Sequence, residues 1–324
     1  MVLQKTLFRT LFLGIAALLA TSAASGASIP PYNAIVSGNF SDSCCDIGGG
    51  LAVGGNATLP SYMSVADAMN GELATAFPSS AMLIIAGTVT GGPAQLYAGD
   101  YYSPNGGVNN VGSGKSISSP DPVTFSTAFT QFQGESNQIS TETPTCTTCV
   151  SGTGTLTITV NRVGLNIINL TTAELAGATS ISFKAGTGVT FASNTTSYGN
   201  AWVLLNVPGI SDTLNLSSGT WFNGSQQVGS TAYGAEDVLY NFYQATSLTF
   251  QGTIVGSVLA PGAAVTDNSG QQIDGSLVAA SFAGSAEFHN LNFLGPTFTP
   301  EPAPAAFVGA GLIALALLRK HRRH

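Results

Sequence analysis

The sequence predicts a mainly β protein, specifically a right-handed parallel β-helix, or solenoid, with at least one amphipathic α-helix packed alongside. Short runs of Val, Ile, Leu and Thr alternate with turns rich in Gly, Asn and Ser, which is the signature of many short strands. Some runs also repeat: "GSVLAPGAAVT" starts at Gly256 and "GSLVAASFAGS" at Gly275, an offset of 19, while "SISFKA" at Ser180 and "NAWVLL" at Asn200 are 20 apart. A period near 20 favours stacked coils, which bury their apolar faces against one another. A β-sandwich, with strands every 8–12 residues or so, remains the alternative.

The expected strands follow the chain from Tyr32 onward. In order they are "NAIVSGNF", "GLAVGGNATL", "MLIIAGTVTGG", "GTLTITVN", "GLNIINLT", "TSISFKAGTGVTF", "AWVLLNVPG", "TLNLSSGTWF", "SLTFQGTIVGSVLAPG" and "GSLVAASF". Several are apolar at every position, which predicts strands covered on both faces. Others alternate strictly, as in "TLTITV", and are expected to expose one face to solvent.

One segment, "PDPVTFSTAFTQFQGESNQI", has helical instead of strand spacing. Asp121 is the candidate N-cap and Pro122 suits the first helical position. The apolar stripe consists of Phe125, Ala128, Phe129, Phe132 and Ile139. We expect this helix to pack its stripe against the solenoid.

Charge is concentrated at the two ends and in an acidic body. The chain has nine Lys and Arg residues against 16 Asp and Glu residues. Between residues 28 and 300 only Lys115, Arg162 and Lys184 are basic, against 15 acidic residues, so this part carries −12. A body this acidic is repelled by the phosphates of nucleic acid, which excludes a nucleic-acid partner.

Residues 1–27 have the three parts of a secretory signal peptide. Lys5 and Arg9 make the start positive, Leu11–Ala20 is an apolar run, and "TSAASGA" supplies small residues for cleavage after Ala24 or Ala27. Ten apolar residues are too few to span a hydrocarbon core of about 30 Å. The sequence therefore predicts export and removal of this segment.

The four cysteines form two close pairs. Cys44 adjoins Cys45, and Cys146 and Cys149 form a CxxC sequence. In an exported protein an even number of cysteines favours disulfides, with three possible connectivities. A zinc site is the competing hypothesis, although adjacent cysteines are poor joint ligands for one ion.

Catalytic groups are scarce. His289 is the only histidine outside the C-terminal tail, and we expect it to be structural. No GxSxG motif occurs, and no Ser–His–Asp or Cys–His set can form without His289. The neighbouring Glu236 and Asp237 are expected to point apart. The protein is therefore not expected to be an enzyme, and a polysaccharide-processing enzyme on a β-helix is the alternative.

Two further ligand hypotheses remain open. Five aspartates in Gly- and Asn-rich turns could offer oxygen ligands to Ca²⁺, although none fits a strict calcium-loop pattern and no cofactor is otherwise expected. They are Asp42, Asp46, Asp100, Asp267 and Asp274. An alternating set of threonines on one face of a strand, which a repetitive surface such as ice would require, consists of Thr153, Thr155, Thr157 and Thr159. Strand propensity also explains these threonines, so ice binding is a second alternative.

The C-terminal segment 299–324 has its own organisation. Pro300, Glu301 and Pro302 precede the apolar run Ala303–Leu318, which as a helix would be about 24 Å long. The basic cluster that follows, and that we expect to stay cytoplasmic, consists of Arg319, Lys320, Arg322 and Arg323. This order resembles the PEP-CTERM sorting signal of Gram-negative bacteria. The resemblance implies a transient tether in the inner membrane and processing by an exosortase; a retained anchor is the alternative.

The body, residues 28–298, resembles the choice-of-anchor A domain. The resemblance rests on "YNAIVSGNFSDSCCDIGGGLAVGGNATL" near Tyr32, on "VLYNFYQATSLTFQGTIVGSVLAPGAAV", and on the later "IDGSLVAASF" and "AEFHNLNF". It implies a β-helical, adhesin-like module without enzymatic activity. We therefore predict an exported module that is displayed on the outer surface or secreted, and that binds exopolysaccharide or another component of a biofilm matrix.

Overall fold

The computed structural model describes residues 32–68, 81–112, 114–118, 121–194 and 197–296. The predicted signal peptide 1–27 and the C-terminal segment 299–324, with its expected membrane helix 303–318, lie outside the described residues. None of the described helices has the length and apolar character needed to cross a membrane.

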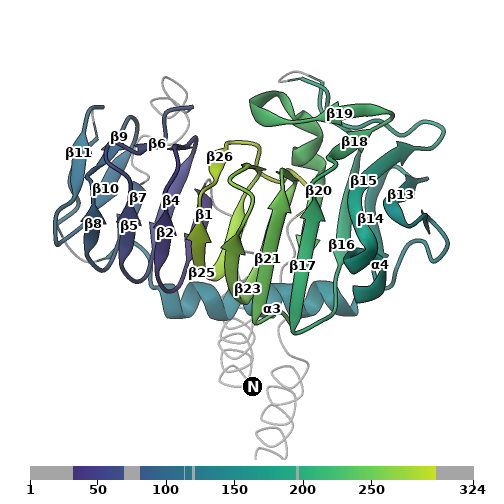
Figure 1. Cartoon of the computed structure of the whole chain (residues 1–324), viewed down its shortest axis with the longest axis horizontal. Coiled ribbons are helices and arrows are strands. Elements are labelled where there is room, and N and C mark those ends of the chain that lie inside the picture. Colours follow the sequence, from purple (N-terminus) through teal and green to yellow (C-terminus); the bar gives the residue numbers. More distant parts are fainter. Residues whose placement is uncertain (1–31, 69–80, 113, 119–120, 195–196, 297–324) are drawn as a thin grey trace, which may run out of the picture. The chain divides into compact units, whose positions relative to one another are not determined.

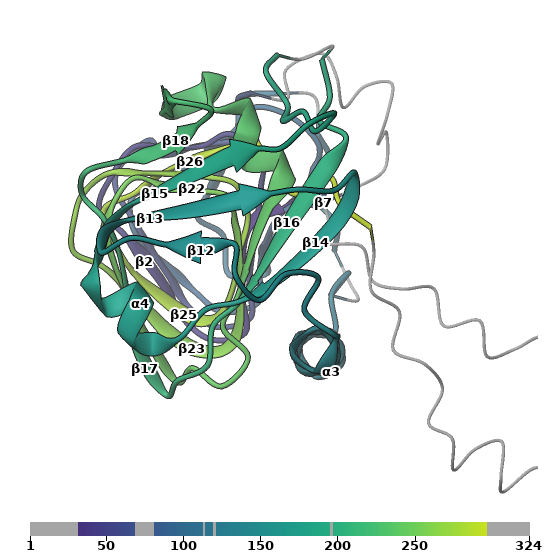
Figure 2. The ribbon, with the colours of Figure 1, turned by 90° about the vertical axis from the view of Figure 1, so that its right-hand side faces the viewer.

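The described body is a β-solenoid with three faces (Figures 1 and 2). Nearly every strand pairs in parallel with the strands of neighbouring coils; the two antiparallel pairs among the described strands lie at the edges of one sheet. The predicted mainly β, parallel solenoid is thus confirmed, and the β-sandwich alternative is not what the chain forms.

The first face is a row of parallel strands that runs the length of the solenoid. Its members, in spatial order, are β10 (Asp100–Tyr102), β7 (Ala81–Ile85), β4 (Gly50–Val53), β1 (Tyr32–Val36), β25 (Leu277–Gly284), β23 (Ser257–Asp267), β20 (Val238–Asn241), β16 (Ala201–Asn206) and β14 (Gly164–Asn169). Strands β23 and β25 are long enough to continue onto the second face. There they join β8 (Val89–Gly91), β5 (Ala57–Leu59), β2 (Phe40–Asp42), β21 (Ser247–Gly252) and β17 (Ser211–Leu216).

The third face contains two smaller sheets. One consists of β11 (Val108–Asn110), β9 (Ala94–Leu96), β6 (Ser64–Val65), β3 (Asp46–Ile47), β26 (Glu287–His289), β24 (Gln272–Asp274) and β22 (Ile254–Val255). The other consists of β12 (Val150–Ser151), β13 (Gly154–Val160), β15 (Ala178–Ala185), β18 (Thr220–Phe222) and β19 (Ser225–Gln227). The remaining elements are α3 (Phe125–Thr141), α4 (Thr172–Gly177), η1 (Gly229–Thr231) and η2 (Tyr233–Asp237).

The chain enters the solenoid in its middle. From β1 it coils outward to β11, and α3 then carries it along the solenoid to the opposite end, as Figure 1 shows. From there it coils back until β25 reaches β1. Ala34 therefore lies opposite Leu51 on one side and Leu277 on the other. Segments far apart in the sequence thus form one continuous stack.

The repeat predicted from the sequence is right at one position and wrong at another. Val258 lies opposite Leu277, which is the expected offset of 19. The preceding Gly256 and Gly275 have φ angles of 124° and 150°, which only glycine adopts readily, and a Cβ on Gly275 would lie 2.6 Å from the Gly256 carbonyl oxygen. These corners explain the repeated "GS". In contrast, "SISFKA" in β15 pairs with β13 and β18, whereas "NAWVLL" in β16 pairs with β14 and β20.

The core is formed by aliphatic and aromatic side chains from successive coils. Phe40 and Phe282, in register on neighbouring strands, stack with ring centroids 5.2 Å apart. Phe288 meets Phe282 edge to face at 5.4 Å. Ring contacts of this kind stabilise the packing of neighbouring coils beyond the area they bury.

Helix α3 packs alongside the solenoid as expected, but it begins later than predicted. It starts at Phe125 after the N-cap Thr124, whose side chain makes no capping hydrogen bond. Asp121 instead accepts a hydrogen bond from the Val123 N–H at 2.9 Å, in a turn before the helix. Because this carboxylate is committed to the turn, the predicted N-cap at Asp121 is wrong.

The buried side of α3 is more polar than the predicted stripe. Phe132 and Ile139 are buried, but Glu135 and Ser136 are buried with them. Ser136 and Asn241 exchange two hydrogen bonds: the Ser136 hydroxyl donates to Oδ1 of Asn241 at 2.5 Å, and Nδ2 of Asn241 donates to the Ser136 carbonyl at 2.9 Å. Polar contacts therefore fix the position of α3 along the solenoid.

Candidate functional site

The second face of the solenoid carries a row of seven residues, five of them threonines, that runs across seven strands. Its outward residues lie opposite one another in register, from β17 through β21, β23, β25, β2 and β5 to β8. In that order they are Thr213, Thr249, Thr266, Ala283, Ser41, Thr58 and Thr90. We call the outward side of these strands the threonine face; Figure 1 shows its strands side by side.

A second row of small polar side chains accompanies the first. It lies two residues earlier, on the strand at Ser211, Ser247, Ala264 and Ser281 and just before the strand at Asn39, Asn56 and Thr88. No residue of either row carries a charge or an aromatic ring. At about 4.8 Å between neighbouring strands, the seven strands extend over roughly 29 Å.

Alternation of exposed and buried residues, clearest in β23, makes this face regular. In β23, Ala264 and Thr266 are exposed, whereas Val265 and Asp267 between and after them are buried. The threonine hydroxyls are close enough to interact across strands, as the 3.0 Å contact between the hydroxyls of Thr58 and Thr90 shows. Methyl and hydroxyl groups therefore recur at the spacing of the coils.

The threonines singled out in the sequence lie elsewhere. Strand β13 places Thr155, Thr157 and Thr159 opposite Ser180, Ser182 and Lys184 of β15, so they are not joined to further threonines. The threonine face takes roughly one threonine from each coil. This pattern was not predicted because it becomes visible only once the pairing of the coils is known.

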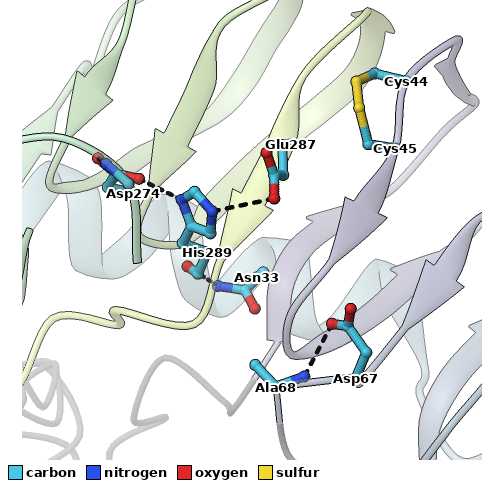
Figure 3. A network of polar contacts seen from close by, with 9 residues as sticks. Asn33, Cys44, Cys45, Asp67, Ala68, Asp274, Glu287 and His289 are labelled. Atoms are coloured by element: carbon cyan, nitrogen blue, oxygen red, sulfur yellow. Dashed lines mark hydrogen bonds and ion pairs between the residues drawn. A yellow bond between two sulfur atoms is a disulfide. The ribbon is translucent and has the colours of Figure 1, made fainter. Parts of the chain in front are cut away.

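A polar cluster lies on the third face, around His289 (Figure 3). Its Nδ1 is 2.6 Å from Oδ1 of the fully buried Asp274, and its Nε2 is 3.2 Å from Oε1 of Glu287. Burial raises the pKa of Asp274 above its ordinary value, against the opposing effect of His289. Burial lowers the pKa of His289, but its contacts with Asp274 and Glu287 outweigh this, so the pKa lies above the usual range.

The geometry of this cluster favours the structural role predicted for His289. Both ring nitrogens contact carboxylates, so neither is free to accept a proton from a substrate. The main contact is to Asp274 on the neighbouring strand β24. Asp67 and Asp46 add negative charge nearby. The pKa of Asp67 is raised mainly by burial and, to a smaller extent, by the charge of Asp46.

Four of the five aspartates considered for Ca²⁺, namely Asp42, Asp100, Asp267 and Asp274, accept hydrogen bonds from backbone N–H groups. Oδ1 of Asp42 accepts N–H groups of Cys44 and Ala286, and Oδ1 of Asp100 accepts that of Lys115. Asp267 accepts N–H groups of its own turn at Ser269 and Gly270. Within the described ranges, no three His, Cys, Asp or Glu side chains converge as metal ligands.

The structure joins Cys44 to Cys45 and Cys146 to Cys149. The first pair lines an open hollow of about 420 Å³ between the second and third faces, together with Asp46, Tyr62 and Met63. The other predicted site residues lie outside the described residues: Pro300, Glu301, Pro302, Arg319, Lys320, Arg322 and Arg323.

Comparisons with known proteins identify the family to which the chain belongs. A family profile described as "Putative Ice-binding-like adhesive domain" matches residues 26–290. No curated protein sequence matches the chain. Two solved structures are similar over most of their length: an ice binding protein from an Antarctic Biological Consortium and an ice-binding protein from the Antarctic ascomycete Antarctomyces psychrotrophicus.

The first of these is 13% identical, with 83% of this chain and 90% of the other covered and a TM-score of 0.32. The second is 14% identical, with 85% and 100% covered and a TM-score of 0.28. The family match extends over most of the chain and includes every strand of the threonine face. The chain therefore belongs to the family of ice-binding-like adhesive domains.

Proposed function

We propose that the protein is an exported adhesive module that attaches to an ordered, uncharged surface through its threonine face, and that ice is the surface this face fits best. The observation that carries the proposal is the in-register row from Thr213 to Thr90. The family description supports the same reading.

The physical argument concerns water next to the face. Methyl groups restrict the orientation of neighbouring water, and hydroxyl groups at a fixed spacing hold that water in place. Charged side chains would impose their own hydration shells, and the two rows contain none. A rigid array of this kind binds through many weak, simultaneous contacts instead of one deep pocket.

Ice binding is tested by slow freezing of a solution of the purified protein and by thermal hysteresis. We expect the protein to be enriched in the ice fraction relative to an acidic, non-binding protein of similar size. Exclusion from ice together with an absence of hysteresis would end the ice hypothesis.

A neutral exopolysaccharide is the second candidate, and the row of amides and hydroxyls beside the threonines favours it. The Nδ2 groups of Asn39 and Asn56 and the hydroxyl of Ser281 can donate hydrogen bonds to sugar oxygens over several strands, whereas the two amide oxygens already accept the N–H groups of Asn56 and Thr88. Co-sedimentation with insoluble polysaccharide from the host matrix tests this candidate. Release of reducing sugar in the same assay would instead indicate the polysaccharide-processing enzyme considered from the sequence.

We further propose the route by which the module reaches the outside. The signal peptide 1–27 directs export, the helix 303–318 tethers the precursor in the inner membrane, and an exosortase cleaves near Pro300–Pro302 before release to the outer surface or matrix. The choice-of-anchor A and PEP-CTERM resemblances support this order. Intact mass of the mature protein from its host, with and without exosortase, tests it, and retention of residues 303–324 in both strains would refute it.

A further inference from the structure

A small hollow on another part of the solenoid combines aromatic rings with carboxylates. It is lined by residues from four segments: the loop before β16, β16 itself, η2 and the segment after β26. These residues are Ala192, Tyr198, Gly199, Trp202, Glu236, Asp237 and Leu294. Because Trp202 lies on β16 of the first face, the hollow is separate from the threonine face.

The size of the hollow limits what it can hold. Its volume is about 190 Å³, below the roughly 300 Å³ at which pockets for drug-sized ligands begin. Trp202 and Leu294 supply apolar wall, and Tyr198 is largely exposed at the rim. The hollow therefore suits a compact group or the end of a longer molecule.

Asp237 is the principal charged group of the hollow. Its side chain is 2% exposed, and Oδ2 accepts the Ala192 N–H at 2.6 Å, whereas Oδ1 accepts no hydrogen bond from a described residue. Gly199 packs directly on the carboxylate: a Cβ there would lie 2.3 Å from Oδ2. Burial, with a smaller contribution from the charge of Glu236, raises the pKa of Asp237 to about 7.

Neither carboxylate has a positive partner among the residues that the structure describes. Across the described residues, the ion-pair contacts are those of His289 with Asp274 and Glu287, and none involves Glu236 or Asp237. Burial also raises the pKa of Glu236. A desolvated, unpaired carboxylate gains more from a bound cation than a hydrated one, because the cation replaces the solvation lost on folding.

We propose that this hollow binds a small organic cation with an ammonium group, held by the charge of Asp237 and Glu236 and by the ring of Trp202. Ammonium groups are attracted to the faces of aromatic rings, most strongly to Trp. The −12 charge of the body raises the local concentration of such cations. A metal ion fits this lining less well because most of the wall is apolar or aromatic.

Choline and its neutral isostere 3,3-dimethylbutan-1-ol are the probes, because they share one shape and differ in charge. Trp221 on β18 does not line the hollow, so Trp221→Phe leaves Trp202 as the sole indole for fluorescence titration. We expect choline to change the Trp202 emission in a saturable way, and the isostere not to do so.

Amino-acid substitutions and changes of pH test whether choline binding depends on Glu236 and Asp237. We expect Glu236→Gln and Asp237→Asn each to weaken choline binding at least about fivefold, whereas Glu287→Gln, outside the hollow, leaves it unchanged. Binding should be strong at pH 8.5 and largely lost at pH 5.5, where Asp237 is protonated. Thermal unfolding checks that each variant is folded.

Three outcomes would overturn the proposal: equal binding of choline and its neutral isostere, binding that does not change between the two pH values, or no saturable change in Trp202 emission at any pH in the folded protein. These results leave the ice and polysaccharide assays unaffected, so the two proposals fail independently.

Discussion

Asn33 on the first strand donates a hydrogen bond from Nδ2 to the carbonyl of His289 on the last strand, at 2.7 Å (Figure 3). The same amide group donates to the carbonyl of Gly275 at 3.0 Å, and its Oδ1 accepts the Gly49 N–H. One fully buried side chain thus joins the first two coils of the chain to its last two. The contact closes the solenoid where outgoing and returning coils meet.

We expect Asn33→Ala to destabilise the protein strongly, because it leaves the Gly275 carbonyl and the Gly49 N–H buried without a partner, whereas the His289 carbonyl keeps the Leu291 N–H. At about 1–3 kcal/mol for each unsatisfied group, and allowing for relaxation, the free energy of unfolding should fall by about 3 kcal/mol. Denaturant unfolding measures this change. Asn105→Ala is the matched control, since Asn105 is exposed and makes one hydrogen bond, to the Gly87 carbonyl. Similar losses in both variants would show that closure does not depend on Asn33.

The titration of Glu135 should make the stability of the protein depend on pH. It is buried between α3 and the solenoid, Oε1 has no hydrogen-bond partner, and burial raises its pKa to about 7. Because the folded state holds this proton more tightly than the unfolded state, whose Glu pKa is about 4.3, stability should decrease as pH rises from about 4 through about 7.

Glu135→Gln should therefore be more stable than the parent protein at pH 8, by on the order of 2 kcal/mol, and should differ little from it at pH 4. Unfolding midpoints measured across this range check the effect. Glu142→Gln, just after the end of α3, provides the control. A parallel shift at all pH values would contradict a role for the titration of Glu135.

We expect the contributions of Asp274 and His289 to the free energy of unfolding to be non-additive. His289→Ala leaves a fully buried carboxylate with the Gly229 N–H as its remaining partner, and loss of one member of such a pair costs about 3–5 kcal/mol. The double variant with Asp274→Ala should recover part of this loss, since no buried charge remains. A double-mutant cycle on unfolding free energies measures the coupling, and additive losses would show that the contact contributes little.

The cysteines give a chemical prediction. Because the structure joins Cys44 to Cys45 and Cys146 to Cys149, the mature protein should have no thiol that reacts under non-reducing, denaturing conditions. Intact mass before and after reduction and alkylation should reveal four newly labelled cysteines, and peptide mapping should place both bridges within single peptides. Bound zinc or free thiols in protein purified without reductant would contradict this pairing.

Local signals in the sequence located the strand runs and helix α3, although they misplaced the N-cap at Asp121, and long-range pairing was not accessible to them. The strand runs, the repeat at Gly256 and Gly275 and the position of helix α3 follow from local spacing. The pairing of Ala34 with Leu277 could not be predicted from local spacing. Parallel coils can pair at any separation along the sequence, and neither strand sequence specifies its partner. The threonine face was missed for the same reason, since it needs the register of seven strands. The hollow at Trp202 likewise needs segments that only the folded chain brings together.

Substitution on the threonine face tests the central claim most directly. Thr249→Tyr and Thr266→Tyr place a bulky ring in the middle of the row while keeping strand propensity. Thr157→Tyr, outward on β13, is the matched control.

The decisive measurement is the fraction of each folded variant that is incorporated into slowly grown ice. We expect the two substitutions on the threonine face to reduce incorporation to the level of a non-binding protein, and Thr157→Tyr to retain that of the parent. Equal incorporation of all the variants, or loss only in Thr157→Tyr, would show that binding does not use the threonine face.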